Sequence, residues 1–147
     1  RHKLKDRAFA DQLEAFLVEE NIDAVVGFCI GGNFVLDVAS HGYEGDLVAI
    51  YPLPWGMDNQ DKIRAAYDYM PSLERDVTII MGEADQLAGP DNIKTIQTIC
   101  AGNPALKLHM YSGSNHGFFT DISGTEETLA SNARDGIAKV NQVLFGE

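Results

Sequence analysis

The stretch Gly27-Phe28-Cys29-Ile30-Gly31-Gly32 decides the fold of this chain. It follows a short apolar run at residues 23–26 and precedes a helix-like stretch at residues 33–39. The pattern Gly-x-nucleophile-x-Gly between a strand and a helix is typical of a sharp turn that exposes a nucleophile, here cysteine where serine is more usual. We expect a side chain at position 27 or 31 to crowd that turn.

Cys29 is the candidate nucleophile. The turn sets its sulfur at the N-terminus of a helix, where free backbone N–H groups favour the thiolate over the thiol. The alternative is a buried structural cysteine in a glycine-rich connection between a strand and a helix.

Two further strands are each followed by a residue that such a nucleophile needs. Asp85 follows the apolar run at residues 77–81, and His116 follows the run at residues 106–111. The order nucleophile, acid, histidine is that of an α/β-hydrolase triad, and in a parallel sheet the three loops meet at one edge. We therefore predict that His116 lies within hydrogen-bond reach of both partners. Asp91 is a rival acid, but its place at a helix start favours a capping role.

Three segments of the chain together resemble the dienelactone hydrolase family: Gly27–Gly32, Gly82-Glu83-Ala84-Asp85 and Asn115-His116-Gly117-Phe118. The resemblance extends over about residues 8–145 and implies an α/β-hydrolase that acts on ester or lactone bonds. It also implies Cys29 as nucleophile, His116 as base and Asp85 as the acid that orients it.

The resemblance matches the C-terminal half of that fold only. The first strands of the full fold have no counterpart in this sequence, nor does the loop that usually donates the second oxyanion N–H. A glutamate that the family places near the cysteine is also without a counterpart.

The implied chemistry is thiolate attack on an ester carbonyl through a thioester intermediate. The backbone N–H of Ile30, one residue after the nucleophile, would bind the oxyanion. Positions after the strands and beside the histidine make four side chains candidates for a substrate pocket: Tyr51, Trp55, Met57 and Phe118. Core packing is the alternative for each of them. The four histidines are scattered without ligand spacing, so we expect neither a metal nor another cofactor.

Strands alternating with helices predict an α/β fold, with a parallel sheet of about four strands and helices on both faces. We expect a partial α/β-hydrolase fold that forms one domain over residues 1–147. The predicted strands, in sequential order, are residues 24–28, 47–51, 77–81 and 106–111. Helical spacing of apolar residues predicts a helix over residues 4–20, a short helix over 59–69, one around 93–100 and a last one after a capping box at 123–126.

Strand 24–28 has an apolar outer edge that no other predicted strand covers. Because an open apolar edge invites pairing with another chain, we expect a two-fold homodimer through antiparallel pairing of these strands. The helix at residues 4–20 folding over the edge is the competing solution.

Composition narrows the partners and the compartment. The net charge is −11, which argues against binding to nucleic acid, although four basic residues lie in the first seven positions. No apolar run approaches the roughly 20 residues needed to span a membrane, and no secretory signal pattern is present. Two cysteines make no disulfide framework, so a reducing cytoplasm is the expected compartment.

Three other functions share parts of this pattern. Class I glutaminases also use Gly-x-Cys-x-Gly, but they place a glutamate two residues after the histidine, where this chain has Phe118. A thiol redox protein is the second alternative. A non-catalytic remnant of the hydrolase fold, serving as an assembly module, is the third.

Overall fold

A computed structural model describes residues 5–146 of the chain. Arg1 and Lys3 of the basic N-terminal cluster lie outside the described residues, as does the first residue of the helix predicted over 4–20.

Four parallel strands form one sheet in the order β1-β2-β3-β4. The strands are β1 (Ala24–Phe28), β2 (Asp46–Ile50), β3 (Val77–Gly82) and β4 (Leu106–Tyr111). Their register runs through pairs such as Val26 with Val48 and Ile79 with Leu108. The predicted sheet, its sequential order and its strand positions are confirmed, with bounds that differ by one residue at β2 and β3.

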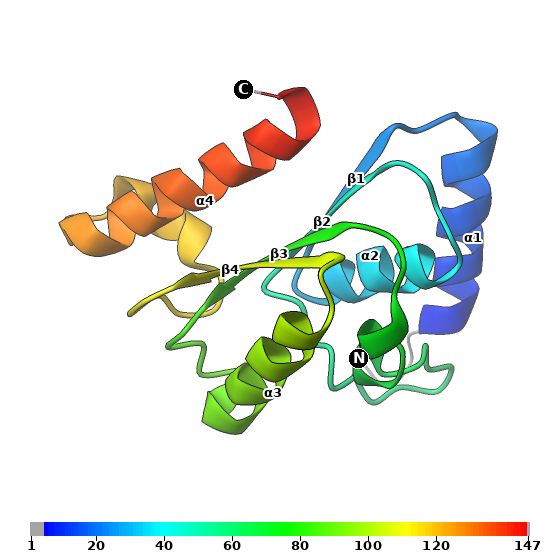
Figure 1. Ribbon diagram of the computed structural model, residues 1–147, viewed down its shortest axis with the longest axis horizontal. Helices are drawn as coiled ribbons and strands as arrows, with labels where there is room; N and C mark the ends of the chain where they lie inside the picture. The colour runs from blue at the N-terminus through cyan, green and yellow to red at the C-terminus, as the bar shows by residue number, and fades with distance from the viewer. Residues whose placement is uncertain (1–4, 147) are drawn as a thin grey trace.

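Helices cover both faces of the sheet (Figure 1). Helices α1 (Asp6–Glu19), α2 (Ile30–Ser40) and α3 (Gly89–Gly102) lie on one side, and α4 (Glu127–Phe145) lies on the other. Neighbouring residues of a strand point to opposite faces. In β3, accordingly, Ile79 packs in the core beneath α2 and α3, whereas Ile80 packs in the core beneath α4.

The helix predicted over residues 59–69 is wrong. The chain there forms two short 3₁₀ turns, η1 (Ala66–Asp68) and η2 (Met70–Ser72), after an extended Ala65. Polar groups of this segment form hydrogen bonds to the first residues of α1 and do not form the backbone hydrogen bonds of a helix. The carbonyl of Asp61 accepts a hydrogen bond from the N–H of Arg7 at 2.8 Å, and Asn59 contacts the carboxylate of Asp6.

The capping box predicted at residues 123–126 is also wrong. Ser123 ends a 3₁₀ helix, η3 (Phe118–Ser123), so it does not stand at the cap position of α4. Glu126 occupies that position, and its carboxylate accepts hydrogen bonds from the N–H groups of Leu129 at 2.7 Å and Thr128 at 3.2 Å. The helix therefore begins with a carboxylate cap rather than a hydroxyl cap.

Strand β1 is an edge strand, as predicted, and no strand of residues 5–146 pairs with its outer side. Helix α1 packs against α2, where the rings of Phe9 and Phe34 lie 4.7 Å apart and Arg7 makes two hydrogen bonds to Asp37. Phe28, at the end of β1, is 48 % exposed. No helix within residues 5–146 is long and apolar enough to cross a membrane.

Candidate active site

Cys29 stands alone between the last residue of β1 and the first residue of α2. Its backbone has φ 55° and ψ −120°, a conformation uncommon for any residue other than glycine. Two hydrogen bonds fix the turn: the N–H of Cys29 donates to the carbonyl of Ile50 at 2.9 Å, and the N–H of Gly32 donates to the carbonyl of Cys29 at 2.9 Å. Strained backbone of this kind is often found at functional sites.

Two glycines make room for the turn. A Cβ atom on Gly27 would lie 2.2 Å from the carbonyl oxygen of Gly31, and one on Gly32 would lie 2.9 Å from Cβ of Pro52. The prediction for position 27 is confirmed. The prediction for position 31 is wrong, because a Cβ atom there would meet nothing within 4 Å. Gly32 is the glycine that is needed, because Pro52 in the loop after β2 leaves no room for a side chain there.

Asn33 joins the turn to the loop that follows β2. Its side-chain amide donates to the carbonyl of Leu53 at 2.8 Å, and its side-chain oxygen accepts from the N–H of Leu53 at 2.7 Å. Asn33 is buried, so both bonds are made away from water. This pair of bonds positions the segment that carries Tyr51 beside the Cys29 turn.

Asp85 and His116 come together at the same edge. Nδ1 of His116 lies 2.7 Å from Oδ2 of Asp85. The other carboxylate oxygen of Asp85 accepts hydrogen bonds from the N–H groups of Leu87 at 2.9 Å and Ala88 at 3.0 Å. Asp85 is 2 % exposed, and a carboxylate that accepts on both oxygens orients the His116 ring with Nδ1–H towards it.

The loops that carry Asp85 and His116 are hydrogen-bonded to each other through backbone groups and the side chain of Asn115. The N–H of Ala84 donates to the carbonyl of Ser114 at 2.9 Å, and Oδ1 of Asn115 accepts from the N–H groups of Gln86 and His116, each at 2.8 Å. Helix α4 adds a third support, because Asn132 donates to Oγ of the buried Ser114 at 2.9 Å. The sequence pattern gives no sign of Ser114 or Asn132, since their partners are distant in the chain.

Tyr51 lies beside both Cys29 and His116. Its ring is 4.9 Å, centroid to centroid, from the ring of His116, and Cys29 packs against the same apolar cluster. Burial raises the pKa of Tyr51, and the nearby charge of a Cys29 thiolate raises it further. The Tyr51 hydroxyl is therefore neutral at physiological pH. Its backbone has φ 36°, a second strained position at this edge of the sheet.

Cys29 makes no hydrogen bond to His116 among the contacts of residues 5–146. The ring of Tyr51 contacts the histidine, and Tyr51 belongs to the apolar cluster against which Cys29 packs. Among the described residues, the acid and the histidine are joined by a hydrogen bond, and the thiol is hydrogen-bonded to neither of them.

Aromatic rings surround the turn. Phe28 lies 5.8 Å from Tyr51 and 6.1 Å from Phe119, measured between ring centroids. Phe118 is completely buried against Tyr51 and Tyr111 in the core beneath α4. Phe28 and Phe119 are not among the pocket residues predicted from the sequence, although the place of Phe28 directly before the nucleophile was a usable signal.

Trp55 and Met57 are grouped elsewhere. They line a pocket of about 390 Å³ together with Ile63 and Ala65, and Trp55 packs against the core on the side of α2 and α3. Of the four predicted pocket residues, Tyr51 and Phe118 lie in the cluster that Cys29 contacts.

Ile30 is the first residue of α2. The first N–H groups of a helix have no partner within it, so the N–H of Ile30 is available directly beside the nucleophile. Within residues 5–146 no group of three or more His, Cys, Asp or Glu side chains is arranged to hold a metal ion.

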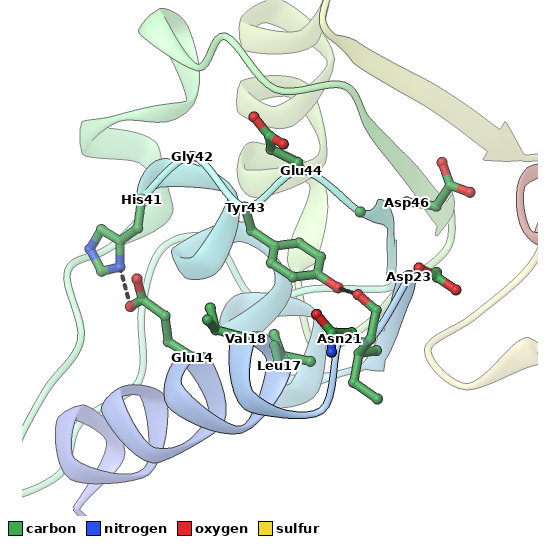
Figure 2. A pocket seen from close by; sticks show the side chains of 12 residues that line it. Glu14, Leu17, Val18, Asn21, Asp23, His41, Gly42, Tyr43, Glu44 and Asp46 are labelled. Atoms are coloured by element: carbon green, nitrogen blue, oxygen red, sulfur yellow. Dashed lines mark hydrogen bonds and ion pairs between the residues drawn. The ribbon is translucent and has the colours of Figure 1, made fainter.

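A larger pocket, of about 650 Å³, lies at the opposite end of the strands from Cys29, where β1 and β2 begin (Figure 2). The His41 ring lies 2.9 Å from the carboxylate of Glu14, and the hydroxyl of Tyr43 donates to the carbonyl of Ile22. Carboxylates of Asp23 and Asp46 also stand around it. None of the predicted site residues lines this pocket.

The family model of the dienelactone hydrolase family matches residues 3–144. This chain belongs to the dienelactone hydrolase family. It is 37 % identical over 146 residues to carboxymethylenebutenolidase 2 of Cupriavidus pinatubonensis, and the match covers 99 % of this chain and 62 % of that protein. It is 28 % identical over 112 residues to a carboxymethylenebutenolidase of Pseudomonas putida, covering 76 % of this chain and 44 % of that one.

Solved structures show the same fold. A Klebsiella pneumoniae protein assigned to the dienelactone hydrolases superposes with a TM-score of 0.68 at 22 % identity, over 90 % of this chain and 57 % of that chain. An alpha/beta hydrolase from a metagenome of lagoon sediments superposes with a TM-score of 0.62 at 15 % identity, over 91 % and 70 %. The predicted α/β-hydrolase-like fold is confirmed. None of these relatives supports the glutaminase, redox or assembly-module alternatives.

The chain spans about three fifths of the length of its 37 %-identical relative and less than half the length of the relative from Pseudomonas putida.

Proposed function

We propose that this chain carries the hydrolytic site of an enzyme that cleaves ester or lactone bonds through Cys29, His116 and Asp85. The hydrogen bond of 2.7 Å between His116 and a buried Asp85, at the sheet edge where Cys29 takes its strained turn, carries the proposal. Two relatives named carboxymethylenebutenolidase support the same class of substrate.

The first half of the reaction is acyl transfer to sulfur. Nε2 of His116 takes the proton of the Cys29 thiol, and the sulfur attacks the carbonyl carbon of the ester. The N–H of Ile30 donates to the oxyanion of the tetrahedral intermediate. As that intermediate collapses, the carbon–oxygen bond to the leaving group breaks, and the leaving oxygen takes the proton back from His116. A thioester remains on Cys29.

Water completes the cycle. Nε2 of His116 takes a proton from a water molecule, whose oxygen attacks the thioester carbonyl. The carbon–sulfur bond breaks, the sulfur recovers the proton from His116, and the carboxylic acid leaves. Asp85 keeps Nδ1 protonated throughout, so Nε2 remains the basic atom.

Cys29 and His116 must approach each other before the first step. Tyr51, packed against the His116 ring, limits where the sulfur and a bound acyl group fit. Tyr51 thus forms the inner wall of the proposed pocket, with the buried Phe118 packed behind it, and Trp55 and Met57 are proposed to extend it from the separate pocket that they line.

Partners and compartment complete the proposal. Removing one oxyanion donor typically lowers turnover about 10²- to 10³-fold, so efficient catalysis needs a second donor beside Ile30.

We propose a homodimer that pairs the exposed β1 edges, with a small ester or lactone as substrate. A thiol nucleophile also favours the reducing cytoplasm as the working compartment.

The test is trapping of the acyl intermediate. Incubation with p-nitrophenyl acetate, followed by peptide mass spectrometry, is expected to place one acetyl group on the peptide that contains Cys29. Cys29→Ala abolishes both the acetylation and the release of p-nitrophenol, whereas Cys100→Ala retains both. Acetylation spread over lysines, or turnover retained by Cys29→Ala, would contradict the proposal.

A further inference from the structure

A pocket of about 270 Å³ lies where α2 ends, between Ser40 and the residues that lead from η2 into β3. Arg64, Tyr69, Glu74 and Arg75 line it. Helix α2 begins next to Cys29 and has 11 residues, so its two ends are about 16 Å apart. The pocket is therefore remote from the candidate active site.

Two arginines of this pocket lack an acidic partner within residues 5–146, although the chain holds 22 acidic residues against 11 basic ones. Arg7 forms ion pairs with Asp11 and Asp37, and Arg134 forms one with Glu127. Arg64 and Arg75 form none with any described carboxylate. The guanidinium of Arg64 lies instead 4.8 Å above the ring centroid of Tyr69.

Two residues that line this pocket each carry a buried polar atom that has no hydrogen-bond partner among the described residues. They are the hydroxyl oxygen of Tyr69 and Nε of Arg75. Tyr69 is 5 % exposed, and its burial raises its pKa, so the hydroxyl stays protonated and able to donate. A buried donor left without an acceptor destabilises the fold, which makes two of them at one place unusual in a folded protein.

Nearby acids do not explain the two orphaned donors. Asp37 is the acid with the largest electrostatic effect on Tyr69, but its two oxygens already accept from Arg7 at 3.1 and 3.0 Å. Glu74 lines the pocket and is exposed, and it makes no ion pair with either arginine. The lining thus holds two positive charges against one negative charge.

We propose that this pocket binds a small oxyanion, a phosphate or carboxylate group, held between Arg64 and Arg75 with the hydroxyl of Tyr69 as a further donor. The guanidinium fork matches the spacing of two oxygens on such a group, and Nε is one of the donors it presents. The pocket volume is below that of typical sites for larger ligands, which favours a small anion.

The test is a calorimetric titration of the wild-type chain with inorganic phosphate, at ionic strength held constant with sodium chloride. Succinate forms a second arm, because it offers carboxylates in place of phosphate. We expect saturable binding of one anion per chain and a rise in melting temperature with its concentration. The arm with the tighter binding identifies which oxyanion the pocket prefers.

Variants then assign the binding to the pocket. Arg75→Gln removes a charge-assisted hydrogen bond and is expected to weaken binding about tenfold or more. Arg75→Lys keeps the charge but removes the fork, so it weakens binding by less. Tyr69→Phe keeps the ring beneath Arg64, equals or exceeds the wild type in stability without anion, and binds the anion more weakly. Arg134→Gln, an equal charge change on α4, leaves the affinity unchanged.

A measurement on the wild type alone guards against variants that fail to fold. In a two-dimensional NMR titration with phosphate, amide signals of residues 72–75 are expected to shift, and those around Cys29 are expected to stay in place. The proposal is overturned if neither anion binds at constant ionic strength, if Arg134→Gln loses as much affinity as Arg75→Gln, or if the amides that shift lie outside the pocket.

Discussion

The backbone of Gly82 lies so close to Ser114 that a Cβ atom on Gly82 would be 2.1 Å from the carbonyl oxygen of Ser114. Gly82 ends β3 three residues before Asp85, and Ser114 precedes His116 by two. The absence of a side chain at one position thus sets how near the acid and the histidine come to each other.

Gly82→Ala is expected to lower the free energy of unfolding by about 1–3 kcal/mol, because the added methyl group meets backbone atoms that cannot move independently. Urea unfolding followed by circular dichroism measures the change. Gly102→Ala is the matched control, since a Cβ atom on Gly102 meets nothing within 4 Å. Equal stability of the two variants would show that the two loops separate without cost.

Asp85→Asn is expected to lower turnover of p-nitrophenyl acetate by about 10³- to 10⁴-fold with little change in fold. The asparagine still accepts from Leu87 and Ala88, but its amide donates to Nδ1 of His116 and moves the ring proton to Nε2. Steady-state kinetics measure the loss. Asp91→Asn, at the exposed start of α3, should retain full turnover; a larger loss there would make Asp91 the acid.

The two thiols are expected to differ sharply in reactivity. Burial raises the pKa of Cys100 to about 11, so at pH 8 only about one molecule in a thousand carries the thiolate there. Cys29 is partly exposed. Iodoacetamide at pH 8 should therefore alkylate Cys29 in the folded chain and Cys100 only in urea, as read by peptide mass spectrometry. Alkylation of both at similar rates in buffer would mean that Cys100 is not protected by the core.

Asn33→Ala is expected to cost about 2–3 kcal/mol of stability, because it leaves the buried N–H and carbonyl of Leu53 without partners. Urea unfolding measures this change in the free energy of unfolding. Asn141→Ala, on the exposed surface of α4, should change stability by less than about 0.5 kcal/mol. A loss no greater at Asn33 than at Asn141 would show that the β2 loop is held by other contacts.

Light scattering at low micromolar concentration is expected to give twice the chain mass of 16.1 kDa. Phe28→Lys places a charge at the end of the proposed pairing strand and should shift the chain towards monomer. Phe145→Lys, which changes a 71 % exposed aromatic residue at the end of α4, should leave the mass unchanged. A soluble wild-type monomer would refute pairing through β1.

The strands could be predicted from the sequence because each is a short apolar run bounded by turn residues, and buried parallel strands require that pattern. The Cys29 turn was predictable for a local reason: Gly27 is needed because a Cβ atom there would meet the carbonyl of Gly31, within the same six residues. The order of the sheet followed from the preference for right-handed crossovers between consecutive parallel strands.

Features that depend on distant partners could not be predicted. Residues 59–69 have a composition that suits a helix, but their polar groups bond to the start of α1. Crowding at Gly32 and its absence at Gly31 depend on where Pro52 of the next loop lies. The separation of Trp55 from the Cys29 cluster depends on which side of the sheet the loop after Tyr51 takes.

The φ of 55° at Cys29 has a consequence for the evolution of this chain. A strained backbone of this kind costs of order 1–3 kcal/mol, and glycine would relieve most of it. Selection for thermal stability alone would therefore drive position 29 towards glycine and discard the sulfur. Selection for acyl transfer has to keep cysteine, the less stable residue at this position. Two directed-evolution experiments, one selecting for thermal stability and one for acyl transfer, should therefore give sequences that differ first at position 29.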